Sequence, residues 1–116
     1  MATLTVQNVD DEGKDLTLAA ASGSGDEWPN SGDEDVIVKN DSGAGVDVTI
    51  TAQVTDVDDR NLGSLAAQDK TQTVSANGGV AIFSGLSRKI HNDSSGNAQI
   101  TYSATTSVEV AVVKRQ

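Results

Sequence analysis

The sequence feature that most constrains the fold is an alternation of apolar and polar residues with a period of two. Over residues 46–54, apolar side chains occupy every second position, and Asp, Thr or Gln fills the positions between them. The same alternation returns over 98–103 and 108–112. Successive side chains of a β-strand point to opposite faces, so each segment predicts a strand with one buried face. No segment shows convincing helical periodicity, and residues 64–69 would form one turn at most.

Shorter strands are predicted between loops rich in Gly, Ser, Asn and Asp. They cover residues 3–7, 15–20, 35–39, 70–75, 79–83 and, as a short edge piece, 88–91. The pair Asn77-Gly78 is typical of a tight turn and predicts a hairpin between its two flanking strands. Eight or so strands of this kind predict an all-β chain, a single antiparallel β-sandwich over residues 1–116 that is jelly-roll-like or immunoglobulin-like. Residues 1–35 are the least regular part and are a candidate arm.

The core of this sandwich has to be built from small β-branched side chains. The chain has only one Trp, one Tyr and one Phe, although aromatic residues bury the largest areas. We therefore expect extra stability from a metal, from high salt or from neighbouring subunits. Trp28 follows a Gly/Ser-rich loop, so its side chain either anchors that loop on the core or inserts into a partner. The strand period places Tyr102 inward.

Acidic residues are crowded into the first half of the chain. Residues 1–60 contain 14 of the 17 acidic side chains and three bases, whereas residues 61–116 contain three acids and five bases. The net charge of −9 disfavours nucleic acid as a partner, because Lys and Arg drive that binding. A surface rich in Asp and poor in Lys suits high salt, where self-repulsion is screened. We expect the acidic half to face solvent.

Few residues offer chemistry. The chain has no Cys, which excludes disulfides and thiolate metal sites. Asp56, Asp58 and Asp59 resemble the start of a calcium loop, but the sequence that follows lacks the glycine and the glutamate of an EF-hand, so a solvated acidic turn is the better interpretation. The single histidine, His91, belongs to no recognisable catalytic or zinc-site pattern and is interpreted as a structural or surface histidine. We expect no enzymatic activity, no cofactor and no membrane association.

The C-terminal third resembles small β-rich structural proteins of tailed viruses, encoded among head and tail genes. The resemblance extends over roughly residues 28–113, and its segments are 82–86, 89–93, 96–103 and 106–113, with 28–32, 35–40 and 46–53 before them. It implies a particle component, a head decoration or minor capsid-type protein, and carries over no catalytic residue. The acidic load departs from that family's pattern and suits a virus of a halophilic archaeon.

We therefore expect a virion structural protein, assembled in the host cytoplasm and located in the virion. The first hypothesis is a capsid decoration (cement) protein that binds the major capsid protein as a homo-oligomer, with a trimer favoured. The second is a tail, neck or head–tail joining component, and the third is a carbohydrate- or receptor-binding sandwich. Candidate partner contacts are Trp28 and the turn formed by Asn77, Gly78 and Gly79.

Overall fold

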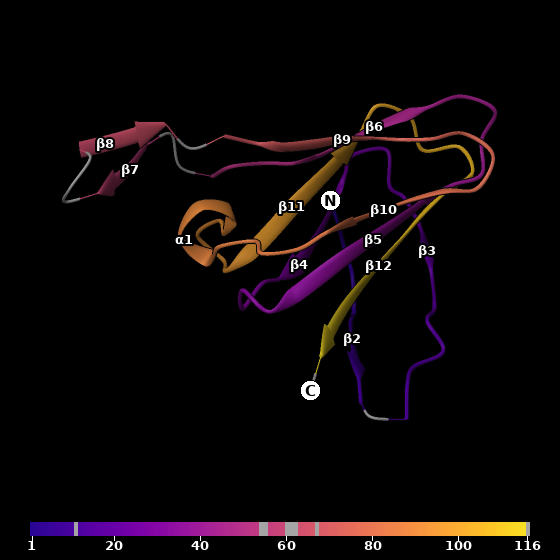
Figure 1. Cartoon of the computed structure of the whole chain (residues 1–116), viewed down its shortest axis with the longest axis horizontal. Coiled ribbons are helices and arrows are strands. Elements are labelled where there is room, and N and C mark those ends of the chain that lie inside the picture. Colours follow the sequence, from indigo (N-terminus) through magenta and orange to yellow (C-terminus); the bar gives the residue numbers. More distant parts are fainter. Residues whose placement is uncertain (11, 54–55, 60–62, 67, 116) are drawn as a thin grey trace.

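The computed structural model describes residues 1–10, 12–53, 56–59, 63–66 and 68–115, with the backbone alone at 56–59 and 63–66. Two β-sheets lie face to face, and a short helix lies at one end of them (Figure 1). The elements are β1 (Ala2–Thr3), β2 (Val6–Val9), β3 (Ala19–Ala20), β4 (Asp26–Pro29), β5 (Glu34–Asn40), β6 (Val46–Ile50), β7 (Asp56–Asp59), β8 (Gly63–Ala66), β9 (Lys70–Val74), β10 (Gly79–Phe83), α1 (Arg88–His91), β11 (Asn97–Tyr102) and β12 (Val108–Arg115).

The main strands have the order of a jelly roll. One sheet runs β4-β11-β6-β9 and the other runs β3-β12-β5-β10, and all these pairs are antiparallel. Numbered along the chain, the eight strands therefore stand in the orders 2-7-4-5 and 1-8-3-6, with most connections crossing from one sheet to the other. This arrangement confirms the predicted all-β sandwich and selects the jelly-roll alternative.

The N-terminal segment covers one side of the sandwich. β1 pairs in parallel with β4, and β2 pairs in parallel with β12, so both sheets are mixed. Leu4, which lies between β1 and β2, is 7% exposed and belongs to the core. β1 and β2 therefore lie along the edges of the two sheets, where they cover edge strands that would otherwise be open to other chains.

The core consists mainly of the apolar positions of the predicted alternation. Its fully buried members are Trp28, Val36, Val38, Val48, Ile50, Leu86, Ala98, Ile100, Val110 and Val112. β5 and β6 bury every second residue, as the period of two requires. Because most of these side chains are Val or Ile, Trp28 is the largest single contributor to the core.

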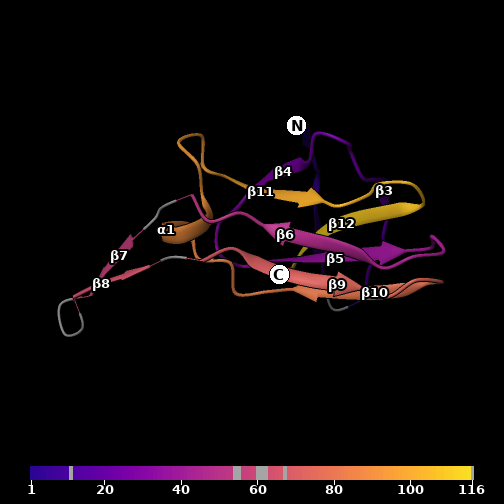
Figure 2. The same cartoon turned by 90° about the horizontal axis from the view of Figure 1, so that it is seen from above.

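Several local predictions were wrong. Of the strand predicted over residues 15–20 only β3 forms, and the segment expected to make one turn at most overlaps the strand β8. Residues 88–91 form the helix α1, which Ser87 caps by accepting a hydrogen bond from the backbone N–H of Lys89 at 3.2 Å. The strand predicted over 46–54 ends at Ile50, and beyond it β7 and β8 form a separate two-stranded ribbon (Figure 2). β4 was not predicted, because its residues Asp26 to Pro29 do not alternate in hydrophobicity.

None of the helices in the described ranges is long and apolar enough to cross a membrane.

Candidate interaction surface

The side of the sandwich opposite the N-terminal segment has two open edges. β9 is the outer strand of one sheet and β10 is the outer strand of the other. Figure 2 shows these two strands side by side along one long side of the molecule. In the part of the chain that the structure describes, neither strand has a second neighbour in its own sheet. Open strand edges present unpaired N–H and C=O groups to other chains.

The turn between these strands was predicted correctly, but the hairpin was not. Asn77 and Gly78 have φ angles of 60° and 95°, as a tight primed turn requires. β9, however, pairs with β6, and β10 pairs with β5. The chain therefore crosses between the sheets at this turn, a choice that local sequence does not encode.

The turn is exposed at its tip and fixed at its base. The backbone N–H of Asn77 donates to Ser42 O at 2.9 Å, and that of Gly78 donates to Asn40 O at 2.8 Å. A Cβ at Gly79 would collide with the Ser75 carbonyl, so this position requires glycine. The three predicted contact residues are thus held together at the start of the open β10 edge, with Asn77 and Gly78 exposed.

β10 combines its open edge with exposed apolar side chains. Val80 is 57% exposed and Ile82 is 66% exposed, and the only other large hydrophobic side chain exposed in the described residues is Met1. Ile82 lies beside the half-buried Ile37 of β5. The sequence of β10 contains no Lys, Pro or charged residue, which are the features that usually protect an edge strand from pairing.

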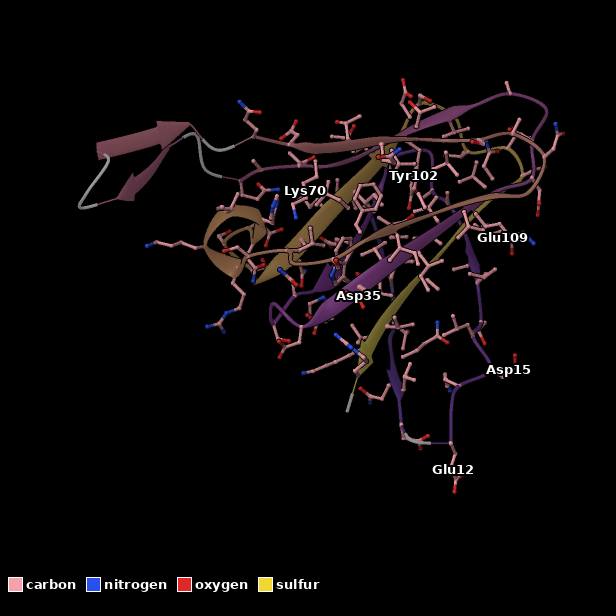
Figure 3. All side chains as sticks on the ribbon, viewed as in Figure 1. Glu12, Asp15, Asp35, Lys70, Tyr102 and Glu109 are labelled. Carbon is pink, nitrogen blue, oxygen red and sulfur yellow. The ribbon has the colours of Figure 1, made fainter. Side chains whose placement is uncertain are left out.

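Charge around the open side differs from that of the rest of the molecule. Residues 70–92 contain no acidic side chain. The ammonium group of Lys70 is turned onto the carbonyls of Ser84 and Gly85, at 3.1 and 3.4 Å. Figure 3 shows Glu12 and Asp15 at the far end of the N-terminal loop, away from Lys70. The exposed β10 edge is therefore apolar and uncharged, whereas the β9 edge is polar, with the Thr73 hydroxyl donating to Asp47 at 2.6 Å.

Trp28 lies in the core, which corrects its assignment as a partner contact. Its side chain is 0% exposed, because β4 pairs with β11 and points Trp28 between the sheets opposite Ala98. Of the two roles that the sequence allowed for Trp28, an anchor of the preceding loop on the core or an insertion into a partner, its position fits the anchor. Its indole N–H has no hydrogen-bond partner among the described residues.

A buried polar pair, Asp26 and Tyr102, lies beside Trp28, because Asp26 is two residues earlier in β4. Asp26, 0% exposed, accepts a hydrogen bond from the Tyr102 hydroxyl at 2.7 Å and one from the Ser22 N–H at 3.2 Å. Burial, together with the hydrogen bond and the charge of Asp26, raises the pKa of Tyr102. A Tyr that stays protonated in the fold acts here as a donor that holds a buried carboxylate.

His91 is buried at the end where the β7–β8 ribbon joins the sandwich. Its exposed fraction is 2%, and its Nδ1 lies 3.4 Å from Thr51 O. Burial lowers its pKa. The candidate cation ligands Asp56, Asp58 and Asp59 belong to β7, but their side chains lie outside the described part of the structure. Among the described side chains, no group of three or more His, Asp or Glu is placed to hold a metal.

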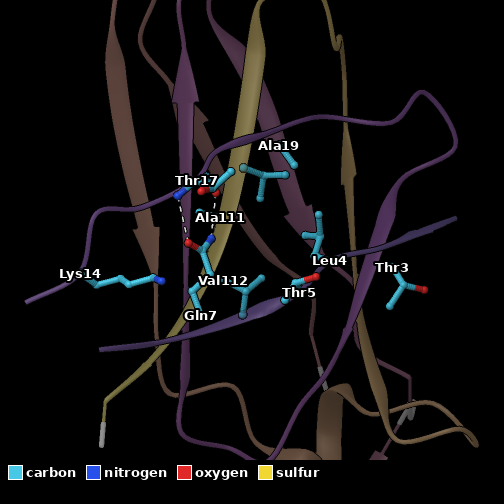
Figure 4. A pocket seen from close by; sticks show the side chains of 10 residues that line it. Thr3, Leu4, Thr5, Gln7, Lys14, Thr17, Ala19, Ala111 and Val112 are labelled. Atoms are coloured by element: carbon cyan, nitrogen blue, oxygen red, sulfur yellow. Dashed lines mark hydrogen bonds between the residues drawn. The ribbon is translucent and has the colours of Figure 1, made fainter. Parts of the chain in front are cut away.

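A cavity of about 360 Å³ lies between the N-terminal segment and β12 (Figure 4). The Gln7 amide spans it, donating to Thr17 O at 2.8 Å and accepting from Thr17 N–H at 2.9 Å. Lys14 is the one ionisable side chain in its lining, which is otherwise Thr, Gln and aliphatic residues. The cavity follows from the loop that crosses the sandwich edge, and its walls bring together no acid and base.

Comparison with protein-family models, with curated proteins and with solved structures finds no match for this chain. Its interaction surface is thus defined by geometry alone. Sequence reasoning found the turn at Asn77 but missed Val80 and Ile82, whose exposure depends on β10 being an outer strand. The sequence does contain a signal for this exposure: residues 79–83 are apolar at consecutive positions, so a strand there has apolar side chains on both of its faces.

Proposed function

We propose that this chain is a virion structural protein, a decoration protein that binds the outer face of a capsid lattice. The observation that supports it is a jelly roll with one covered side and one side of open strand edges, where β10 exposes apolar side chains and contains no acidic residue. Jelly rolls form many viral capsid domains, although they also occur in lectins and cupins. Because a fold alone does not determine function, the proposal also rests on the sequence resemblance to tailed-virus particle proteins.

The mechanism would be burial of surface between neighbouring subunits. A cement protein adds contacts that tie capsomers together and resist internal pressure, so it needs adhesive surface and no catalytic group. The open β9–β10 side supplies such surface, and the acidic loops of the first half keep the outer face hydrated. The net charge of −9 would also discourage contact with packaged nucleic acid.

Quantitative mass spectrometry of purified particles of the encoding virus tests the proposal. A decoration protein is expected at hundreds of copies per particle, in a fixed ratio to the major capsid protein. A dozen copies or fewer would instead identify a neck or tail component. Absence of the chain from the particles would overturn the virion assignment altogether.

The carbohydrate-binding alternative lacks a stacking surface. Sugar rings bind well on exposed aromatic faces, but Trp28 is 0% exposed, Phe83 is 7% exposed, and Tyr102 is partly buried against the core. These are the chain's only aromatic residues. We therefore expect no binding to a glycan array at low or at molar salt, and specific binding there would revive this alternative.

A further inference from the structure

We propose that a second copy of this chain pairs with β10 in antiparallel fashion across a two-fold axis, so that two sandwiches share one continuous sheet. This proposal rests on the geometry of β10 and holds whether or not the protein belongs to a particle. It replaces the trimer expected from the sequence with a dimer. The two copies would use the same surface, as a two-fold interface requires.

The direction of the backbone groups of β10 follows from its neighbours. The N–H of Asp41 donates to Ser107 O at 2.9 Å, so Asp41 directs its backbone groups toward β12. Every second residue of β5 before it does the same, and these residues include Lys39 and Ile37. Since bonding directions alternate along an antiparallel strand, the intervening Val38 and Val36 face β10.

The partners of Val38 and Val36 on β10 are Ala81 and Phe83, which therefore direct their N–H and C=O groups toward β5. Val80 and Ile82, between them, direct theirs outward. The two residues with the most exposed apolar side chains on this strand are thus also the two whose backbone groups face away from the sandwich.

Two-fold pairing satisfies both features of these residues at once. Placing Val80 opposite Ile82 of the second copy, with Ala81 on the axis, forms about four backbone hydrogen bonds. In this register, side chains on the outer face of the shared sheet form a row that runs across both copies. The row consists of Lys39 and Val80 of one copy, followed by Ile82 and Ile37 of the second copy. Two such rows lie beside each other, so the exposed side chains of both chains cover one another.

Charge favours this surface over the others for contact between copies. Each chain carries −9, so copies repel one another over most of their surface. The row around β10 contains no acidic residue. Its one charged residue, Lys39, lies 3.6 Å from Asp41 and opposite Glu109 of β12, so the acids nearest to the row lie behind β10, next to a positive charge of their own chain. Two copies can therefore meet here without bringing carboxylates together. Because the remaining repulsion is long-range, we expect salt to strengthen the dimer.

Light scattering or sedimentation of the purified chain at molar salt tests the association. The wild type is expected at twice the chain mass of 11.9 kDa. Ile82→Lys puts a charge on the shared row and is expected to give a monomer, while its matched control Thr71→Lys, on the β9 edge, leaves the dimer intact. A monomeric wild type at millimolar concentration, a trimer, or an Ile82→Lys variant that stays dimeric would overturn the proposal.

Cysteine substitution tests the register, because the chain has no native Cys. Ala81 would face its own copy in a non-hydrogen-bonded pair with Cα atoms about 4.5 Å apart, within reach of a disulfide. Val80 would lie about 8 Å from its own copy, beyond that reach. Mild oxidation is expected to link Ala81→Cys into covalent dimers and to leave Val80→Cys unlinked. Equal linking of both variants, or none of Ala81→Cys, would contradict this pairing.

Discussion

Replacing Trp28 by Ala tests whether the sandwich depends on its one large core side chain. Trp28 is 0% exposed between sheets built mostly of Val and Ile, which cannot spread to fill the space of an indole. Truncation of a buried Trp to Ala costs about 3–5 kcal/mol, a large share of the roughly 5–15 kcal/mol that stabilises a domain of this size. At about 4 °C per kcal/mol, the melting temperature is expected to fall by about 12–20 °C.

A second variant separates volume from polarity. Trp28→Phe leaves a smaller gap, and it also removes an indole N–H that has no partner among the described residues. A buried unsatisfied donor costs about 1–3 kcal/mol, which offsets much of the lost packing. We therefore expect Trp28→Phe to lie within about 1 kcal/mol of the wild type.

Guanidinium denaturation followed by far-UV circular dichroism measures both variants, since each removes the only Trp and its fluorescence. Thr71→Ala, at an exposed edge position, is the control and should change stability by less than about 0.5 kcal/mol. A Trp28→Ala variant that also stays within that range would contradict a core that depends on the indole. It would mean that the core closes without the indole and that Trp28 is free to act elsewhere.

Three further outcomes follow from the structure. Gly25→Ala is expected to cost at least about 2 kcal/mol in denaturant titration, because φ is +90° and the new Cβ would lie 2.7 Å from Ile100 O, whereas Gly43→Ala, which meets nothing within 4 Å, should be neutral. Since the fold raises the pKa of Tyr102, the unfolded chain loses this proton near pH 10 while the folded chain keeps it. Stability should therefore fall above pH 10 by up to about 1.4 kcal/mol per pH unit, and Tyr102→Phe should reduce that slope; equal slopes would exclude this coupling. The unfolding midpoint should rise from low to molar salt, because salt screens the repulsion among the acids of the first half; a constant midpoint would contradict the high-salt interpretation.

Local pattern determined most strands but not their partners. Val46, Val48 and Ile50 are buried as their alternation predicts, because a period of two defines one inward face whatever the neighbouring strand. Pairing is different, since Asn77-Gly78 forms the same turn whether its flanking strands bond to each other or enter different sheets. The sequence therefore predicted a sandwich and left open which strands would be outermost.

The candidate surface was only partly predictable for the same reason. The turn at Asn77 and Gly78 could be predicted locally, because Asn followed by Gly is the pair that most readily adopts the positive φ angles of such a turn. The exposure of Ile82 could not be predicted locally, because the same five residues in the middle of a sheet would have neighbouring strands on both sides. Trp28 shows the converse, since an adjacent Pro and Gly-rich loop fit both a core anchor and a partner contact until β4 is placed beside β11.

A density map of the intact particle, at a resolution that separates strands, tests whether this chain is a decoration protein. We expect this jelly roll on the outer face of the shell, with pairs of copies joined through β10 and the loop that carries Glu12 and Asp15 turned to solvent. Density for the chain inside the shell or at the tail, or its absence from the particle, would contradict the proposed function. Outer-face density with β10 turned away from other copies would leave that function standing and refute the dimer.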